Sequence, residues 1–261
     1  MDLGIKGERA IVLAGTRGIG FGCTEALAKA GCRVAFNGIS AENGQKALAK
    51  LRGLDVHYVQ GDVMKPAERD RIYAEARQWL GGDATIVVTN STGPAAGSFA
   101  SKTPDDWRQA FEGNMLNAVD FAYKTVPGMI AAGYGRIVNI NSMSAKEPSY
   151  NTPLGNGVKA AMIGAMASLA REVADKGVTV NNILPGPIET ELLRRYAKFM
   201  VRREELDDDT ATRMFAETVP AKRLGTIEEC GALCAFLASR LAGYITGQSI
   251  AIDGGVIRSI Y

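Results

Sequence analysis

A glycine-rich turn near the start of the chain has the composition of a phosphate-binding loop. It follows the apolar run at 9–14 and precedes a stretch with helical periodicity. Glycines let the backbone turn tightly and let a ligand approach the main chain, and amide N–H groups at a helix start attract phosphates. The turn therefore predicts binding of a dinucleotide through its pyrophosphate. Its residues are Gly15, Thr16, Arg17, Gly18, Ile19 and Gly20.

Further segments carry residue types that occur together in one known family. In sequence order they are Gly61-Asp62-Val63, Asn90-Ser91-Thr92-Gly93, Asn114 within FEGNMLNA, Pro185-Gly186-Pro187-Ile188-Glu189-Thr190 and Asp253-Gly254-Gly255. With the glycine turn they span about residues 9 to 255 and resemble the short-chain dehydrogenase/reductase family. The family's first loop glycine falls on Ala14, and we expect Gly15 to absorb the extra methyl group.

This resemblance implies contacts to a nicotinamide cofactor along the chain. Asp62 and Val63 match the element that binds the adenine, and Asn90 matches the residue that steadies the central sheet. The segment that would flank the nicotinamide contains Pro185, Gly186, Ile188 and Thr190.

The cofactor expected from the sequence is NADP(H), with NAD(H) possible. An acid at the end of the second strand would bind the ribose 2′-hydroxyl of NAD and repel a 2′-phosphate. That region reads Phe36-Asn37-Gly38-Ile39-Ser40 and contains no acid. Arg17 lies where many NADP-using relatives carry a base, and a guanidinium there can pair with the phosphate.

The same resemblance implies a catalytic set with one member missing. In the family, a serine and a tyrosine contact the substrate oxygen, a lysine holds the nicotinamide ribose and lowers the tyrosine pKa, and an asparagine anchors a water. Ser142, Lys159 and Asn114 match three of these residues. The tyrosine position, thirteen residues after Ser142 and four before Lys159, is Gly155.

Three outcomes stay open for this gap. In the first, another group, such as Tyr150, Lys159 or a water, does the acid–base work. A positioned acid contributes roughly 10²–10⁴-fold to the rate, so its loss impairs the reaction without forbidding it. Alternatively, the reaction needs little acid help, as in hydride addition to an enone. Lys146-Glu147-Pro148 and Asn156 resemble a tyrosine-lacking branch of the family that includes a conjugate-type reductase. In the third outcome the chain is a catalytically silent cofactor-binding subunit or sensor.

The elements that must position these residues alternate along the chain. Strands are expected at 9–14, 33–37, 56–60, 84–90, 136–141, 178–184 and 249–253, with helices at 18–30, 41–52, 66–79, 104–131, 156–175 and 226–239. Such alternation predicts one α/β domain over 1–261, a Rossmann-type doubly wound parallel sheet with helices on both faces. The resemblance implies seven strands in the order 3-2-1-4-5-6-7.

Residues 187–222 interrupt this alternation. The segment is charged, has helical propensity, and follows the carboxyl end of a strand, where ligands bind in such sheets. We expect a substrate lid. Arg194, Arg195, Arg202 and Arg203 are candidates to hold an anionic substrate, although pairing with nearby acids such as Glu204 is the simpler expectation.

Composition bounds the remaining possibilities. A net charge of +2 gives no reason to expect nucleic acid or an anionic membrane as a partner. The four cysteines have no metal-type spacing and are expected to be small buried thiols, and His57, the single histidine, is expected to be structural. No apolar signal region begins the sequence, so we expect a cytoplasmic protein. The family resemblance implies a small-molecule substrate and a homotetramer or homodimer, and no metal is expected.

Overall fold

The computed structural model describes residues 1–201, 203 and 205–259, with only the backbone of residue 199. One parallel sheet has the order β3-β2-β1-β4-β5-β6-β7, as predicted. Its strands are β1 Arg9–Val12, β2 Arg33–Gly38, β3 Val56–Gln60, β4 Ile86–Thr89, β5 Gly135–Ile140, β6 Val178–Pro185 and β7 Ser249–Ile252. The strand order reverses between β1 and β4, which is where such sheets bind ligands.

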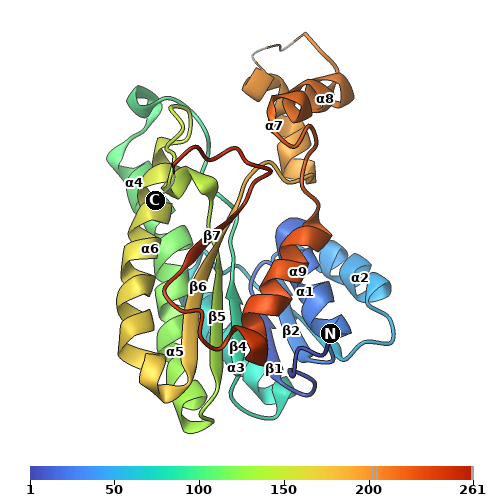
Figure 1. The fold of residues 1–261 in the computed structure, drawn as a ribbon, viewed down its shortest axis with the longest axis vertical. Coiled ribbons are helices and arrows are strands. Elements are labelled where there is room, and N and C mark those ends of the chain that lie inside the picture. The colour runs from blue at the N-terminus through green and yellow to red at the C-terminus, as the bar shows by residue number, and fades with distance from the viewer. Residues whose placement is uncertain (202, 204, 260–261) are drawn as a thin grey trace.

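Helices cover both faces of the sheet. Those described are α1 Gly18–Lys29, α2 Ala41–Lys50, α3 Pro66–Leu80, α4 Pro104–Phe111, α5 Asn117–Ala131, α6 Pro153–Val173, α7 Glu191–Val201, α8 Asp208–Thr218 and α9 Ile227–Ala238. The elements α1, α2 and α9 pack on one face, and α3, α5 and α6 pack on the other (Figure 1). In β1, Val12 belongs to the first core and Ile11 to the second. A strand buried on both faces needs this unbroken apolar run.

Local signals fix several helix boundaries. A capping box joins Thr103 to Asp106 at the start of α4, and another joins Thr226 to Glu229 at the start of α9. Each box satisfies two amide donors that the first turn would leave free. The helical stretch expected at 104–131 contains a π-turn, η2 Glu112–Leu116, between α4 and α5. Helix α6 starts at Pro153, three residues before the predicted start at 156.

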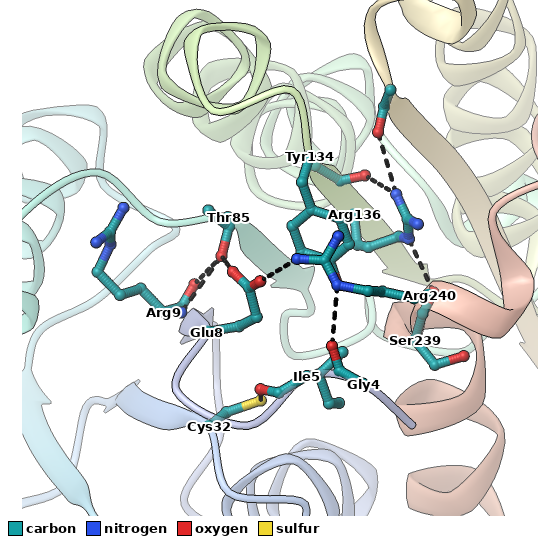
Figure 2. Close-up of polar contacts among 12 residues, drawn as sticks. Gly4, Ile5, Glu8, Arg9, Cys32, Thr85, Tyr134, Arg136, Ser239 and Arg240 are labelled. Carbon is teal, nitrogen blue, oxygen red and sulfur yellow. Dashed lines mark hydrogen bonds and ion pairs between the residues drawn. The ribbon is translucent and has the colours of Figure 1, made fainter. Parts of the chain in front are cut away.

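The amino ends of the strands are joined by a polar network around Tyr134. The guanidinium groups of Arg136 and Arg240 each lie 4.4 Å from the centre of the Tyr134 ring. Arg240 pairs with Glu8 at 2.9 Å, and Arg136 Nε donates to the Ser239 carbonyl at 3.1 Å (Figure 2). Burial raises the pKa of Tyr134 to about 12. The network ties the N-terminal segment to β5 and to the end of α9, at the edge opposite the expected site.

Helices α7 and α8 lie within the segment expected to be a lid. They project beyond the carboxyl ends of the strands, above α9 and α2 (Figure 1). Their helical structure agrees with the propensity of residues 187–222. Two of the charges considered for this segment, Arg202 and Glu204, lie outside the described residues.

Two smaller expectations are supported. All four cysteines, Cys23, Cys32, Cys230 and Cys234, are buried free thiols. His57 lies on β3 with its ring stacked on Trp79, the centroids 5.1 Å apart, as suits a structural residue. Among the described helices, none is both long and apolar enough to cross a membrane.

Candidate cofactor and active site

The glycine turn is packed so closely that side chains are excluded at two positions. A Cβ atom on Gly20 would lie 2.2 Å from the Ala14 carbonyl oxygen, and one on Gly15 would lie 2.6 Å from Thr24 Oγ1. Thr24 Oγ1 is within hydrogen-bond distance of the carbonyls of both Gly15 and Gly20, at 3.2 and 3.0 Å. Gly18 has a φ of +55°, in the left-handed region that favours glycine. The turn therefore requires its glycines.

Ala14 itself adopts a left-handed backbone, with a φ of +47°. We expected its cost to be the added methyl group; the structure shows that the backbone conformation is also unfavourable for a residue with a Cβ. Two contacts from Asn37 at the end of β2 hold this part of the turn. Asn37 Oδ1 accepts from the Ala14 amide at 2.8 Å, and its carbonyl accepts from the Gly15 amide at 2.8 Å.

A pocket lies beside the turn, where the family resemblance places the adenosine half of the cofactor, and it is called the adenosine pocket below. It brings together the turn, the end of β2, the first turn of α2 and the segment after β3. Asn37 joins two of these segments, because its Nδ2 donates to the Gly61 carbonyl at 2.8 Å. Asp62 is the one acid among the described lining residues. It follows β3, so the described lining contains no acid from the end of β2, where an NAD-binding acid would lie. The lining residues are Ala14, Thr16, Arg17, Asn37, Gly38, Ile39, Ser40, Asn43, Gly61, Asp62, Val63, Met64 and Thr92.

Arg17 lies at the rim of this pocket and also contacts the lid segment. Its Nη1 is 3.3 Å from Glu191 Oε2, and both side chains are 61% exposed. The pair joins the glycine turn to the first residue of α7. No motif in the sequence indicates this contact, because the two residues are 174 positions apart.

The central part of the site is held by asparagines. Asn90 Nδ2 is 3.5 Å from the Ala14 carbonyl, which links the end of β4 to the glycine turn. Asn114 lies in the π-turn, where its Nδ2 donates to the Ala110 carbonyl at 3.2 Å. Its Oδ1 accepts from Ser91 Oγ at 3.0 Å. Turns of this kind occur frequently at functional sites.

A buried arginine, Arg69, joins the segment after β3 to the π-turn. Its Nε donates to the Val63 carbonyl at 2.7 Å, and its Nη2 donates to the Glu112 carbonyl at 2.9 Å. Its Nη1 also pairs with the Glu112 carboxylate at 2.9 Å. Sequence analysis missed this residue, and the only signal for it is an arginine on a helix face that must be buried.

Ser142 and Lys159 are brought together at the end of β5 by Asn141. Asn141 Oδ1 accepts from the Ser142 amide at 2.9 Å, and Asn141 Nδ2 donates to the Lys159 carbonyl at 3.1 Å. Ser142 Oγ accepts from the amide and the hydroxyl of Ser144, at 3.1 and 2.9 Å. With Ser144 as the donor in both contacts, the hydroxyl proton of Ser142 can be offered to another acceptor, such as a substrate oxygen.

Lys159 is a buried cation. Its Nζ donates to the Ile140 carbonyl at 3.1 Å, and the residue is only 7% exposed. Burial lowers the pKa of Lys159 from 10.5 to about 8, because a charged ammonium is poorly solvated there. An amine with this pKa can hold or release a proton near neutral pH.

The space at the missing tyrosine is open. Gly155 lies in the first turn of α6, and the nearest atom to a Cβ built there is Thr152 Cβ at 3.9 Å. Tyr150, considered as a replacement, is 68% exposed in the preceding loop, in contrast to the buried Lys159. Asn156 stabilises that loop, because its Nδ2 donates to the Ser149 carbonyl at 2.6 Å.

The Pro-Gly segment leads from β6 to α7 along the expected nicotinamide side. A Cβ on Gly186 would lie 2.5 Å from Asp253 Cβ, so this close approach requires glycine. Ile188 pairs with Gly225 in an isolated parallel bridge. Thr190 Oγ1 accepts from the Leu193 amide at 3.1 Å and so satisfies a donor in the first turn of α7.

The described charges of residues 187–222 pair largely with one another. Arg194 contacts both Glu189, at 2.6 Å, and Asp209, at 3.0 Å, while Arg195 pairs with Glu191. Arg203 pairs with Glu205. Internal pairing, the simpler expectation, is therefore confirmed for the described arginines. Another contact reaches the active-site loop, where Asn151 Nδ2 is 3.7 Å from Met200 Sδ of α7.

Comparison with known proteins agrees with this geometry. The family model described as "Enoyl-(Acyl carrier protein) reductase" matches residues 13–257. The 3-oxoacyl-[acyl-carrier-protein] reductase FabG of Escherichia coli is 31% identical over 261 residues, which cover 97% of this chain and 99% of the relative. This chain belongs to the short-chain dehydrogenase/reductase family.

Solved structures of similar proteins share the whole fold of this short-chain dehydrogenase/reductase. The L-sorbose reductase of Gluconobacter frateurii, solved with NADPH and L-sorbose, has a TM-score of 0.93 and 30% identity, with 100% of both chains covered. YwfH, described as an NADPH-dependent reductase involved in bacilysin biosynthesis, has a TM-score of 0.88 and 30% identity, with 98% of this chain and 100% of YwfH covered. The seven-stranded fold and the oxidoreductase family expected from the sequence are therefore confirmed.

Proposed function

We propose that this chain is an NADP(H)-dependent reductase of a small carbonyl compound or activated alkene, or of the corresponding alcohol in reverse, with Gly155 in place of the usual tyrosine. The observation that carries the proposal is that Asn141 links the main chains of Ser142 and Lys159, while the space around a Cβ on Gly155 is open. NADPH, when bound, supplies a hydride from its nicotinamide ring.

The adenosine pocket supports NADP(H) over NAD(H). Its glycine turn lies at the start of α1, where main-chain N–H groups can bind a pyrophosphate. The end of β2 offers Ser40 and Asn43 instead of an acid, and Arg17 supplies a guanidinium at the rim. The similar L-sorbose reductase was solved with NADPH, which agrees with this choice.

The catalytic residues suit a reaction in which negative charge grows on a substrate oxygen. Ser142 can donate its hydroxyl proton to that oxygen, supported by the two hydrogen bonds from Ser144. The Lys159 ammonium provides a positive charge close by and can return a proton through a water. Hydride addition to an enone gives a delocalised enolate, so this set favours activated alkenes over simple ketones. The resemblance of residues 146–148 and Asn156 to the tyrosine-lacking branch points the same way.

Turnover measurements test the proposal. The absorbance of NADPH near 340 nm is followed with a panel of ketones and enones, for the wild type, Ser142→Ala and Gly155→Tyr. We expect enone turnover in the wild type, its reduction in Ser142→Ala, and a gain in ketone turnover of up to about 10²-fold in Gly155→Tyr. Gly155→Phe fills the same space without a hydroxyl and should show no gain.

The second candidate, a silent cofactor-binding subunit, is favoured by the missing tyrosine alone. NADPH binding by calorimetry, without turnover of any substrate in the panel by the wild type or Gly155→Tyr, would establish it and overturn the reductase. Absence of binding to either cofactor would overturn both candidates.

We further propose a homotetramer or homodimer in the cytoplasm. Phe111 at the end of α4 and Tyr123 of α5 are 40% and 78% exposed, which suits a helix face that packs against another subunit. The four free buried thiols suit a reducing compartment. Light scattering coupled to size-exclusion chromatography measures the assembly, and a monomer at micromolar concentration would contradict it.

A further inference from the structure

Arg17 serves two parts of the molecule. It lines the adenosine pocket, and its Nη1 contacts Glu191 Oε2 at 3.3 Å. Glu191 is the first residue of α7 and therefore belongs to the lid. The guanidinium that would bind the 2′-phosphate of NADP(H) already has an anionic partner, and that partner comes from the lid.

The contact of a neighbouring residue places Glu191 close to the glycine turn. The neighbouring residue Thr190 has its Cγ2 3.6 Å from the position of a Cβ on Gly18, in the middle of the glycine turn. The Glu191 carboxylate also accepts from Arg195 of α7. Arg195 and then Arg17 hold the pKa of Glu191 below its usual value, so the side chain is an anion at neutral pH.

The charge of Glu191 reaches α2 on the other side of the pocket. The pKa of Lys46 is raised, chiefly by Glu42 and to a smaller extent by Glu191. Ser40 and Asn43, at the start of the same helix, line the pocket where the 2′-phosphate would lie. Glu191 thus contacts the glycine turn through Arg17.

We propose that Glu191 is a specificity-determining residue that competes with the 2′-phosphate of NADP(H) for Arg17, so that binding of the phosphorylated cofactor releases the start of α7. The inference rests on the proposed function as an NADP(H)-binding protein. A carboxylate and a phosphate repel each other at this distance, so both cannot approach one guanidinium without cost. NAD(H) lacks the phosphate and leaves the pair intact.

The expected size of the effect is modest. Arg17 and Glu191 are both well exposed, and such ion pairs contribute little in water. We expect removal of the Glu191 charge to tighten NADP+ binding about 2- to 5-fold. The effect should weaken at high salt, because surface charges are screened.

Calorimetric titration with NADP+ and NAD+ at low salt tests the competition. Glu191→Gln should tighten binding of NADP+ and leave that of NAD+ unchanged. Glu189→Gln is the matched control, since Glu189 is two positions away and pairs with Arg194 instead of Arg17. This control removes the same charge and should leave the ratio of the two affinities unchanged.

A double-mutant cycle completes the test. Arg17→Gln should weaken NADP+ binding and abolish the effect of Glu191→Gln, because it removes the guanidinium for which Glu191 and the 2′-phosphate compete. An unchanged affinity ratio in Glu191→Gln, or an equal shift in Glu189→Gln, overturns the competition and leaves the proposed function intact. Failure of the wild type to bind either cofactor overturns the proposed function itself.

Hydrogen exchange of residues 191–201 reports on the lid directly. At saturation, NADP+ should leave the amides at the start of α7 less protected than NAD+ does. In the NADP+ complex, Glu191 no longer forms its ion pair with Arg17. In Glu191→Gln the two cofactors should give the same protection. A difference that persists in this variant contradicts the proposed release.

Discussion

At the scale of single residues, the site combines groups that are unfavourable for stability. Lys159 is a cation without a carboxylate among its described partners, and its burial lowers its pKa to about 8. Ala14 holds a left-handed backbone that glycine would adopt more easily. Such strained or poorly solvated residues concentrate at functional sites, where the surrounding structure holds them in place.

The burial of Lys159 predicts a pH dependence of stability. Because the folded-state pKa lies below the unfolded value of 10.5, the unfolded chain binds the proton more tightly between pH 8 and 10.5. The cost of burying the charge, about 3 kcal/mol, is therefore fully present below pH 8 and disappears as the pH rises through this window.

Urea unfolding of the wild type and Lys159→Met measures this cost. The variant should be more stable than the wild type at pH 7, and the difference should shrink toward pH 10. Comparing the two proteins cancels the titration of other groups. A difference that does not depend on pH would show that the ammonium is not desolvated in solution.

At the scale of elements, Arg69 connects the cofactor pocket to the π-turn that carries Asn114. Its three contacts hold Val63 on one side and Glu112 on the other. Met64 packs on Gly113 in the same junction, where a Cβ would lie 1.8 Å from the Met64 methyl carbon. The segment after β3, with Val63 and Met64, and the π-turn therefore form one packed unit.

Arg69→Met should lower the free energy of unfolding by about 3 kcal/mol, because a buried carbonyl and a partly buried carbonyl lose their donor. It should also weaken cofactor binding, since the Val63 wall is released. Glu112→Gln keeps the main-chain acceptor and loses one partly exposed ion pair, so its cost should stay below about 1 kcal/mol. Denaturant unfolding and cofactor titration measure both effects, and equal losses in the two variants would contradict the role of the arginine.

The elements also show where sequence reasoning succeeds and where it ends. The alternation of strands and helices and the glycine turn follow from local patterns in the sequence. The strand order and the spacing of Ser142, Gly155 and Lys159 were implied by the family resemblance, and the structure agrees with the strand order. The contacts of Arg69, Asn141 and Glu191 were missed. These partners meet only after the sheet forms, and no periodicity or motif in the sequence records the direction of a long polar side chain.

At the scale of the whole molecule, the two ends of the strands have separate roles. The side of the sheet formed by the carboxyl ends is called the carboxyl edge here, and the side formed by the amino ends is called the amino edge. The carboxyl edge carries the cofactor pocket, Ser142 and Lys159. The amino edge carries the Tyr134 network, in which Glu8, Arg136 and Arg240 join distant parts of the chain (Figure 2). Stability and binding should therefore respond independently to substitutions at the two edges.

Tyr134→Phe tests this separation. It removes the hydrogen bond from the Tyr134 hydroxyl to the Ala238 carbonyl, 2.6 Å away, and keeps the ring between the two guanidinium groups. The expected loss is about 1–2 kcal/mol, or roughly 2–5 °C in Tm. Cofactor affinity should not change, and a parallel loss of affinity would show that the two edges are coupled.

The central place of β1 bears on how the chain is made on the ribosome. Ala10 pairs with Val34 on one side and with Ile86 on the other. At about 5–20 residues per second, the strand that completes this pairing emerges roughly 4–15 s after β1 itself. During that interval an apolar strand has an unpaired edge, so the nascent chain is most exposed to non-native pairing until β4 arrives.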